Sequence, residues 1–470
     1  MNRLQLRQLL QGIIIFLIPL LFLIPDPSFF AIPGFTLSHQ RMLAILVMAL
    51  LFWILEPIPI FATSVLIITA ELFLISNQSP RWLLLNDGQG MMLKYTEVLA
   101  SFASPIIILF LGGFFLAIAA SKYKLDRNLA RILLRPFGQD PKWLMLGLMV
   151  ITAVFSMFMS NTATTAMMLA ILAPVLASFD IDDPARKAFL LCIPLAANVG
   201  GIGTPIGTPP NAIALKYLTG EYAVSFAEWM AFGLPYVTIL LIFAWLLLIF
   251  AFKPKQSRMQ VNIEGRFEKN WQAYTVYATF LLTIGLWLSG DFHGMNSYVV
   301  AMVPVALFSA TGIIGKQDLK KISWDVLWLI SGGIDLGYGL ESTGLTSTLI
   351  AAVPLDSIGG IGIILFFTIM TLLMASFMSN TATANLMLPL IAAIAVNLES
   401  LIALGGLQVT VIVVTLTCSI GMALPISTPP NALAYATGEL DTKDLMKIGG
   451  IVSLFGLLMV YILGAILAFI

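Results

Sequence analysis

Charged residues are scarce in this chain of 470 residues, of which 10% are Asp, Glu, Lys or Arg. A soluble domain carries about 25% charged residues, so this composition excludes an ordinary soluble protein. Hydrophobic residues make up 59% of the chain, and the mean hydropathy is +0.97. Apolar runs of about 20 residues, the length of a membrane-spanning helix, recur along most of the sequence. The composition therefore predicts an all-α polytopic membrane protein.

Cysteine and histidine are nearly absent, with two residues of each. Cys192 and Cys418 lie in apolar runs, so we interpret them as small buried hydrophobic residues rather than a disulfide or a metal pair. No Ser/His pair, aspartate pair or cluster of transition-metal ligands falls at expected membrane depth, so an enzyme is not expected. The net charge is zero and gives no indication of a nucleic-acid partner.

The apolar runs predict about eleven transmembrane helices. The first run follows Arg3 and Arg7, as a signal peptide would, but no small-residue cleavage site follows it, so we interpret it as a spanning helix. After the fourth span, Leu125–Phe137 carries three arginines four residues apart, which predicts an amphipathic interfacial helix. The expected spans are 10–26, 41–57, 58–76, 104–121, 188–205, 231–252, 271–290, 295–314, 325–341, 406–425 and 447–469.

Two polar motifs each occur twice, in the same order. Phe-Met-Ser-Asn-Thr-Ala-Thr stands at Phe158–Thr164 and again at Phe377–Thr383. A Pro-Ile-Gly/Ser-Thr-Pro-Pro-Asn-Ala segment follows each copy, at Pro205–Ala212 and at Pro425–Ala432. Small polar residues also serve tight helix packing in membranes. Two matched pairs of helix-breaking motifs in an apolar chain point more strongly to a functional site.

The first motif of each pair lies inside a stretch that is too long for one span, Trp143–Ala177 and Gly359–Val396. Each stretch can be one long helix, two full spans, or a re-entrant hairpin with the motif at its tip near the midplane. Hairpins that return to their own side, with a cytoplasmic N-terminus, leave twenty of the 24 Lys and Arg residues inside. Four remain outside, namely Arg41, Arg81, Lys94 and Lys216. This distribution follows the positive-inside rule, so we favour the hairpins and an outside C-terminus.

The duplication extends beyond these motifs. Leu111–Gly113 and Ser331–Gly333 match at the same separation of about 220 residues. Five net crossings separate the fourth span from the ninth, and an odd number predicts that the repeats are inverted relative to one another. Inverted repeats with a midplane site between them are a common plan of secondary transporters.

The motifs indicate how such a site binds ions. Helices that begin at the two Ser-Asn-Thr segments point free N–H groups and positive dipole ends toward an anion. The prolines of the second motifs free backbone carbonyls that suit a hard cation such as Na⁺. A proton-coupled carrier usually has an acidic or histidine residue at its site, and Asp335 is the nearest candidate. We interpret Asp335 as a helix-end charge, and Glu56 and Glu71 as interfacial turn residues.

At these residues the chain resembles the divalent anion/sodium symporter family of di- and tricarboxylate carriers. The two Ser-Asn-Thr segments match the hairpin tips of that family, and the Thr-Pro turns match its unwound helix breaks. The resemblance covers nearly the whole chain. It implies a homodimeric elevator-type transporter in the cytoplasmic membrane that couples a C4 dicarboxylate, such as succinate, malate or fumarate, to Na⁺. A dicarboxylate exchanger or a sulfate or citrate carrier of the same architecture is the alternative, and a channel is a third possibility.

The resemblance also implies site residues by position. In the alignment of the two repeats, Ala375 stands where the first repeat has Ser156. A cation site built on the second repeat therefore lacks the hydroxyl group that Ser156 supplies in the first. Substrate is expected at Asn161, Thr162, Thr208, Asn380, Thr381 and Thr428. Sodium is expected at Ser156, Ser160, Asn161 and Gly207 in one site and at Ala375, Met378, Asn380 and Ser427 in the other. The scaffold is expected in residues 1–137 and 253–357, and the mobile transport part in residues 138–252 and 358–470.

Overall fold

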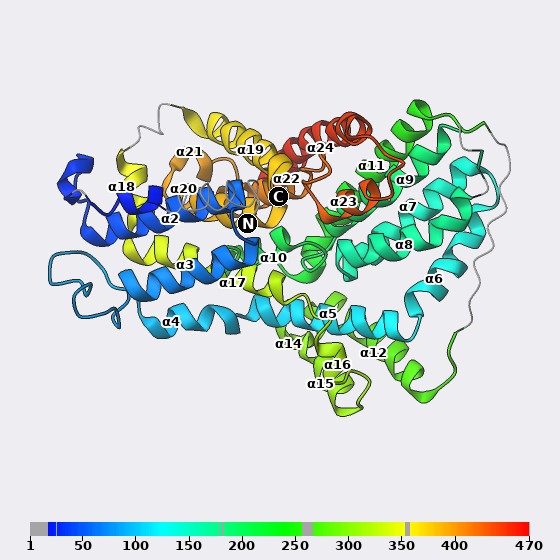
Figure 1. Cartoon of the computed structure of the whole chain (residues 1–470), viewed down its shortest axis with the longest axis horizontal. Coiled ribbons are helices and arrows are strands. Elements are labelled where there is room, and N and C mark those ends of the chain that lie inside the picture. Colours follow the sequence, from blue (N-terminus) through cyan, green and yellow to red (C-terminus); the bar gives the residue numbers. More distant parts are fainter. Residues whose placement is uncertain are drawn as a thin grey trace, which may run out of the picture.

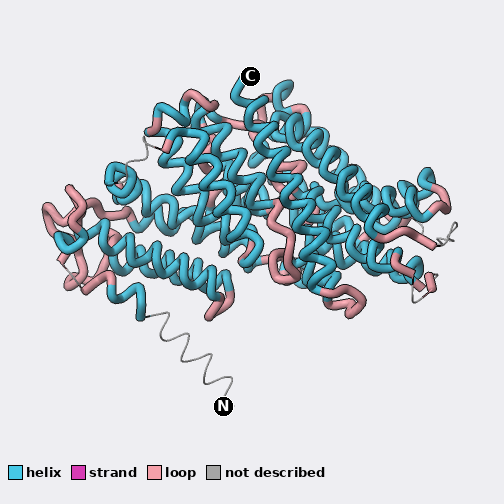
Figure 2. The backbone as a smooth tube through the Cα atoms, turned by 90° about the horizontal axis from the view of Figure 1, so that it is seen from above, coloured by secondary structure: helices cyan, strands magenta, loops and turns pink. Residues whose placement is uncertain are grey.

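Helices account for the regular structure of this protein in the computed structural model, which describes residues 17–24, 26–177, 179–180, 183–255, 267–352 and 358–469. The tube drawing shows helices joined by loops, and no strand appears in the described ranges beyond one isolated bridge between Ser76 and Leu93 (Figure 2). Residues 10–16 and 25 of the expected first span, 10–26, lie outside the described residues. The all-α prediction is confirmed for the part of the chain that the structure describes.

A helix is found at each of the other ten expected spans. The first half contains α2 (Leu37–Leu55), α3 (Ile60–Leu74), α4 (Tyr95–Ala100), α5 (Pro105–Lys122), α6 (Leu125–Leu134), α7 (Pro141–Phe158), α8 (Asn161–Leu176), α9 (Ala185–Gly201), α10 (Pro209–Leu215) and α11 (Phe226–Ala251). The second half contains α12 (Trp271–Leu288), α13 (Gly290–His293), α14 (Ser297–Val300), α15 (Met302–Ala310), α16 (Lys316–Leu319), α17 (Trp324–Thr343), α18 (Leu345–Ala352), α19 (Gly359–Phe377), α20 (Asn380–Asn397), α21 (Glu399–Ile402), α22 (Gly406–Ser419), α23 (Pro429–Tyr435) and α24 (Thr442–Phe469). Short 3₁₀ turns also occur at Pro27–Phe30, Ser101–Ala103, Arg135–Phe137 and Gly220–Tyr222.

By length and composition, seven helices of the described ranges can cross a membrane, and four shorter apolar helices accompany them. The total of about eleven spans therefore stays a prediction. The expected span 295–314 is divided into α14 and α15 at Ala301. A Cβ at Gly112 of α5 would lie 2.5 Å from the carbonyl oxygen of Ala301, so the two backbones approach closely at this division.

The two stretches that carry the Ser-Asn-Thr motifs, Trp143–Ala177 and Gly359–Val396, are both broken helices. The first breaks between α7 and α8 at Met159 and Ser160, and the second between α19 and α20 at Met378 and Ser379. The one-long-helix alternative is therefore wrong for both stretches. Both proline segments also interrupt a helix, between α9 and α10 and between α22 and α23, as expected from the missing N–H groups.

The two repeats pack in matching ways and exchange their short helices. α7 and α8 pack against α9, as α19 and α20 pack against α22. The short helix α10 packs against α20 of the other repeat, and α23 packs against α8. α4 and α5 run along the lower side of the molecule, with α14, α15 and α16 projecting below α5, and α19 and α24 lie along the upper side (Figure 1). The packing of α10 and α23 against the opposite repeat brings all four helix breaks into the region between the repeats.

Candidate functional site

Serine residues cap the helices that begin at the two Ser-Asn-Thr segments. Ser160 Oγ accepts a hydrogen bond from Ala163 N at 3.2 Å, and Ser379 Oγ accepts one from Ala382 N at 3.1 Å. Asn161 is the first residue of its helix rather than the cap, as is its counterpart Asn380 in α20. Because serine satisfies the third N–H group, the asparagine side chains are left available for other partners.

Asparagine residues bind the carbonyl groups that the two proline breaks release. Asn211 Nδ2 lies 2.9 Å from the oxygen of Thr204 and 3.2 Å from the oxygens of Gly201 and Ile202. Asn431 Nδ2 donates to the oxygens of Met422 and Leu424, at 2.8 and 3.0 Å. These two asparagines therefore hold the unwound turns in shape, and the carbonyl groups that they bind are less available to a cation.

One cavity of about 590 Å³ lies where the breaks meet. The described residues that line it include no Lys, Arg or His, and the only acidic residue among them is Asp325. A cavity of this size holds any small dianion, so its volume does not select among succinate, citrate and sulfate. The lining contains all six residues expected to bind substrate: Asn161, Thr162, Thr208, Asn380, Thr381 and Thr428.

Three oxygen atoms converge beside the first tip. Ser156 Oγ lies 2.5 Å from Asn161 Oδ1 and 2.7 Å from the carbonyl oxygen of Ala197. A Cβ at Gly201 would lie 2.7 Å from Asn161 Oδ1 and 3.0 Å from the oxygen of Gly207. The single hydroxyl hydrogen of Ser156 can be donated to only one of these two oxygens at a time. The cluster therefore has unused oxygen lone pairs, which suit a hard cation. Ser160, also expected here, caps α8 with its hydroxyl oxygen, which keeps a second lone pair for a cation.

The equivalent atoms beside the second tip are arranged differently. Asn380 Oδ1 is buried and has no hydrogen-bond partner among the described residues, while its Nδ2 lies 3.5 Å from the oxygen of Ser419. Ala375 is fully buried and its Cβ packs against Gly421, so it supplies no hydroxyl. Ser427 Oγ lies 2.6 Å from the oxygen of Leu424. A buried amide oxygen without a donor is costly, and a bound cation removes that cost.

Asn198 of α9 is a cavity-lining residue that the sequence analysis missed. Its Nδ2 lies 3.1 Å from Thr428 Oγ1 and 3.1 Å from Asn431 Oδ1, so it joins the first repeat to the second proline turn. Cys418 stands at the equivalent position of the second repeat, so Asn198 belongs to no duplicated motif that could have pointed to it. A lone asparagine in an apolar run was the available signal.

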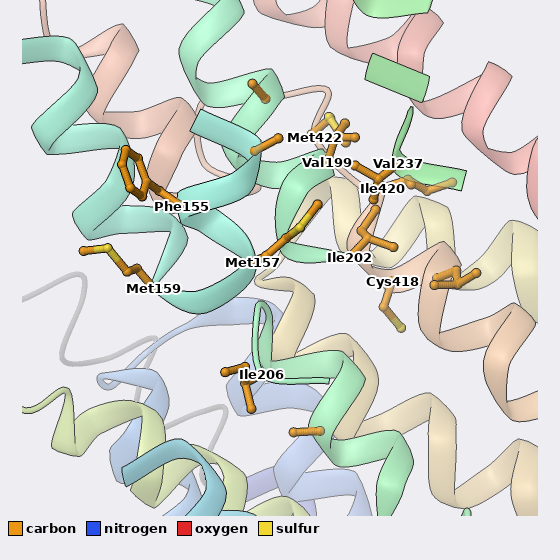
Figure 3. Packing of buried hydrophobic residues seen from close by; sticks show 14 of the residues in the cluster. Phe155, Met157, Met159, Val199, Ile202, Ile206, Val237, Cys418, Ile420 and Met422 are labelled. Atoms are coloured by element: carbon orange, nitrogen blue, oxygen red, sulfur yellow. The ribbon is translucent and has the colours of Figure 1, made fainter. Parts of the chain in front are cut away.

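Apolar side chains surround the breaks. Ile202 and Ile206 lie on the first unwound turn and Ile420 and Met422 on the second, and all four belong to one buried cluster (Figure 3). Met157 and Met159 flank the first tip in the same view. This dry packing lowers the local dielectric around the tips, which strengthens the interaction of their N–H groups with an anion.

Comparison with known proteins shows the family. The family model described as the sodium:sulfate symporter transmembrane region matches residues 5–469. The chain belongs to the divalent anion/sodium symporter family. This is a family of membrane transporters and not of enzymes, so the expectation that the protein is a transporter is confirmed.

Relatives of this family member include bacterial and fungal transporters. It is 30% identical to the sodium-dependent dicarboxylate transporter SdcS of Staphylococcus saprophyticus, over 97% of this chain and 90% of that protein. It is 28% identical to the inorganic phosphate transporter PHO87 of Saccharomyces cerevisiae, over 88% of this chain and 45% of that protein. The crystal structure of the Alcanivorax borkumensis YdaH transporter aligns with a TM-score of 0.56 at 14% identity, over 80% of this chain and 88% of that one. That likeness supports the fold alone.

Three charged residues lie where the sequence analysis did not place them. Asp335 and Glu71 are fully buried within α17 and α3, so the interpretation of Asp335 as a helix-end charge and of Glu71 as a turn residue is wrong. Lys216, assigned to an outside loop, lies at the end of α10 with its ammonium 2.5 Å from the oxygen of Ile334. Hydropathy does not reveal such burial, because the partners come from distant parts of the chain.

Proposed function

We propose that this protein is a secondary active transporter that couples the Na⁺ gradient to the uptake of a C4 dicarboxylate such as succinate, malate or fumarate. The observation that carries the proposal is the single cavity lined by both Ser-Asn-Thr tips and, among the described residues, by no Lys, Arg or His. A dianion in such a cavity requires cations bound close by to balance its charge. The sodium-dependent dicarboxylate transporters among the relatives support both the ion and the substrate class.

The residues divide into substrate and sodium ligands. Each tip holds one carboxylate, through its asparagine and threonine and the nearby Thr208 or Thr428. One Na⁺ binds at Ser156, Ser160, Asn161 and Gly207. A second binds through the backbone carbonyls of Ala375, Met378 and Ser427 and the side chain of Asn380. The oxygen cluster at Ser156 and the partnerless Asn380 Oδ1 support these two positions. Coupling follows if the cavity moves across the membrane only when cations and anion are both bound.

We further propose a homodimer that works as an elevator in the cytoplasmic membrane, with its N-terminus in the cytoplasm and its C-terminus outside. Residues 1–137 and 253–357 form the scaffold, and residues 138–252 and 358–470 form the moving part with its two hairpins. The assignment is supported by the position of all four helix breaks inside the second pair of ranges. Light scattering of the purified protein tests the dimer, and cysteine labelling from each side of the membrane tests the orientation.

Uptake into proteoliposomes tests the transport function. Labelled succinate should accumulate when Na⁺ is higher outside, and the accumulation should disappear when K⁺ replaces Na⁺. Uptake that is indifferent to Na⁺ but stimulated by internal succinate would contradict symport and favour exchange. Competition by citrate, sulfate and phosphate ranks the anions, and sulfate winning over succinate would replace the C4 assignment. Flux that a Na⁺ gradient cannot drive uphill would favour a channel.

Asparagine substitutions test the site. Asn161→Ala and Asn380→Ala should each abolish Na⁺-driven uptake, because each removes a ligand at a tip. Asn397→Ala is the matched control, since Asn397 lies at the exposed far end of α20 and its amide donates only to the oxygen of Ala393, at 2.8 Å. Unimpaired uptake in either tip variant would show that the tips are structural.

A further inference from the structure

Ionisable side chains are buried around α17, away from the residues that line the cavity. Glu71 of α3 and Asp335 of α17 are both 0% exposed. Their four carboxylate oxygens have no hydrogen-bond partner among the described residues. Lys216, which ends α10, donates instead to the backbone oxygen of Ile334 at 2.5 Å. A carboxylate buried without a donor is among the most costly arrangements in a protein, so this group requires an explanation.

Glycine residues of α17 leave room for these side chains. A Cβ at Gly339 would lie 2.5 Å from Glu71 Oε1, and a Cβ at Gly337 would lie 2.5 Å from Lys216 Nζ. The hydroxyl of Tyr217, also buried without a partner, would lie 2.6 Å from that second Cβ. α3 and α10 therefore bring their polar side chains directly against the α17 backbone.

The charges of this group do not balance. Glu71 and Asp335 repel one another, and Lys216 attracts both. One ammonium and two carboxylates leave one negative charge in surroundings that include Met42 and the apolar core of α2, α3 and α17. A metal ion needs several ligands, whereas no group of three or more His, Cys, Asp or Glu side chains comes together among the described residues. A proton neutralises the excess charge without further ligands.

We propose that Glu71, Asp335 and Lys216 form a further ion site of this transporter, separate from the cavity, which holds one exchangeable proton on one of the two carboxyl groups. The group occurs once, because Ala436 and Phe115 stand at the positions of the other repeat that correspond to Lys216 and Asp335. The fold therefore does not require it. Both repeats have the proline turn and the short helix, but the short helix ends at Lys216 in the first repeat and at Ala436 in the second.

The site is joined to the cavity by α10. Thr208, the N-cap of this seven-residue helix, lines the cavity, and Lys216 is its C-cap. If α10 moves relative to α17 during transport, Lys216 leaves the two carboxylates, which then require a second proton. This coupling step rests on the proposed transport function, whereas the presence of the proton does not.

Other ionisable groups near the site are already bound or exposed. Glu341, further along α17, is exposed and attracts Lys216. On α2, His39 Nε2 lies 2.8 Å from the oxygen of Thr343, and Arg41 donates to the backbone oxygens of Leu74 and Leu83. On α20, Asn385 donates to the oxygen of Leu329 at 2.9 Å. Glu341 therefore provides a carboxyl control on the same helix.

Infrared spectroscopy of the purified protein, titrated from about pH 5 to about pH 9, tests the proposal, because buried carboxyl groups titrate in this range. The wild-type protein should show the absorption of one protonated carboxylic acid at neutral pH. Glu71→Gln and Asp335→Asn should each remove it, because Lys216 then balances the remaining carboxylate. Lys216→Met should double it, and Glu341→Gln should leave it unchanged.

Several outcomes overturn the proton site. One is a wild-type spectrum without the band, and another is a band that survives both single carboxyl substitutions. A cation-dependent carboxylate shift on adding Na⁺ without substrate, lost in Glu71→Gln, replaces the proton with a metal ion. If one variant does not fold, the other carboxyl variant and Lys216→Met still decide the matter. Na⁺-driven uptake by the wild-type protein is measured separately, so failure of transport and failure of the proton site are distinguishable.

Discussion

Ser156 Oγ lies 2.5 Å from Asn161 Oδ1, whereas Asn380 Oδ1, the equivalent atom of the second repeat, has no hydrogen-bond partner among the described residues. The difference arises because Ala375 stands in the place of Ser156. Two tips of identical sequence therefore present different donor sets, and the two proposed cation sites are expected to differ in affinity.

Exchange of this hydroxyl between the repeats should shift the sodium dependence of uptake in opposite directions. Ser156→Ala removes a hydroxyl that contributes about 1 kcal/mol to the free energy of Na⁺ binding. The Na⁺ concentration for half-maximal uptake should therefore rise about fivefold. Ala375→Ser adds one beside Asn380 and should lower that concentration. The measurement is succinate uptake against Na⁺ at fixed substrate. Identical Na⁺ curves for both variants and the wild-type protein would contradict the assignment.

A methyl group at Gly201 should displace the Asn161 amide from the oxygen cluster beside the first tip. Its Cβ would lie 2.7 Å from Asn161 Oδ1 and 2.9 Å from Nδ2, closer than real Cβ contacts allow. Gly201→Ala should therefore abolish Na⁺-driven uptake. Gly285→Ala in α12 is the control, because a Cβ there meets nothing within 4 Å. Full activity of Gly201→Ala would mean that this cluster has no part in transport.

Asn198→Ala should weaken substrate binding by loosening the second proline turn. The substitution removes the two 3.1 Å contacts to Thr428 and Asn431, each worth about 1 kcal/mol. Together they are worth about 2 kcal/mol, so the substrate concentration for half-maximal uptake should rise by about thirtyfold, with little change in the Na⁺ dependence. A change confined to Na⁺ dependence would place Asn198 in a cation site instead.

An ion pair at the end of α5 should make stability depend on pH. Burial raises the pKa of Asp318, but hydrogen bonds from Lys122, Lys321 and the Gly315 backbone outweigh it and lower the pKa to about 2. Because this pKa is depressed, the stabilisation is present above about pH 4 and is lost as the pH falls toward about 2.

Substitution of this aspartate isolates its contribution. Asp318→Asn should lower the free energy of unfolding at neutral pH by about 1 kcal/mol, after allowance for the partial exposure of Lys122. The difference from wild type in thermal unfolding should shrink as the pH falls below about 4. Asp87→Asn, in an exposed loop, is the control. A difference that is independent of pH would assign the effect to packing rather than charge.

The helices and their breaks were predictable because the signals are local. Apolar runs, the prolines at 209–210 and 429–430, and the serines that cap α8 and α20 act on the backbone within one or two turns. The duplicated motifs also predicted which residues share the cavity, since a repeat implies equivalent positions. The residues without a repeat counterpart, such as Asn198, were missed for the same reason.

Composition and motif spacing were enough to predict a helical membrane protein whose paired helix breaks line one cavity, because hydropathy and proline chemistry do not depend on distant partners. The environment of Glu71, Asp335 and Lys216 depends on distant partners instead. These residues lie on three helices far apart in the chain, and the same side chains would be ordinary interfacial charges if α3 and α10 did not pack against α17. Their environment is set by the packing of those helices, which no local pattern of the sequence records.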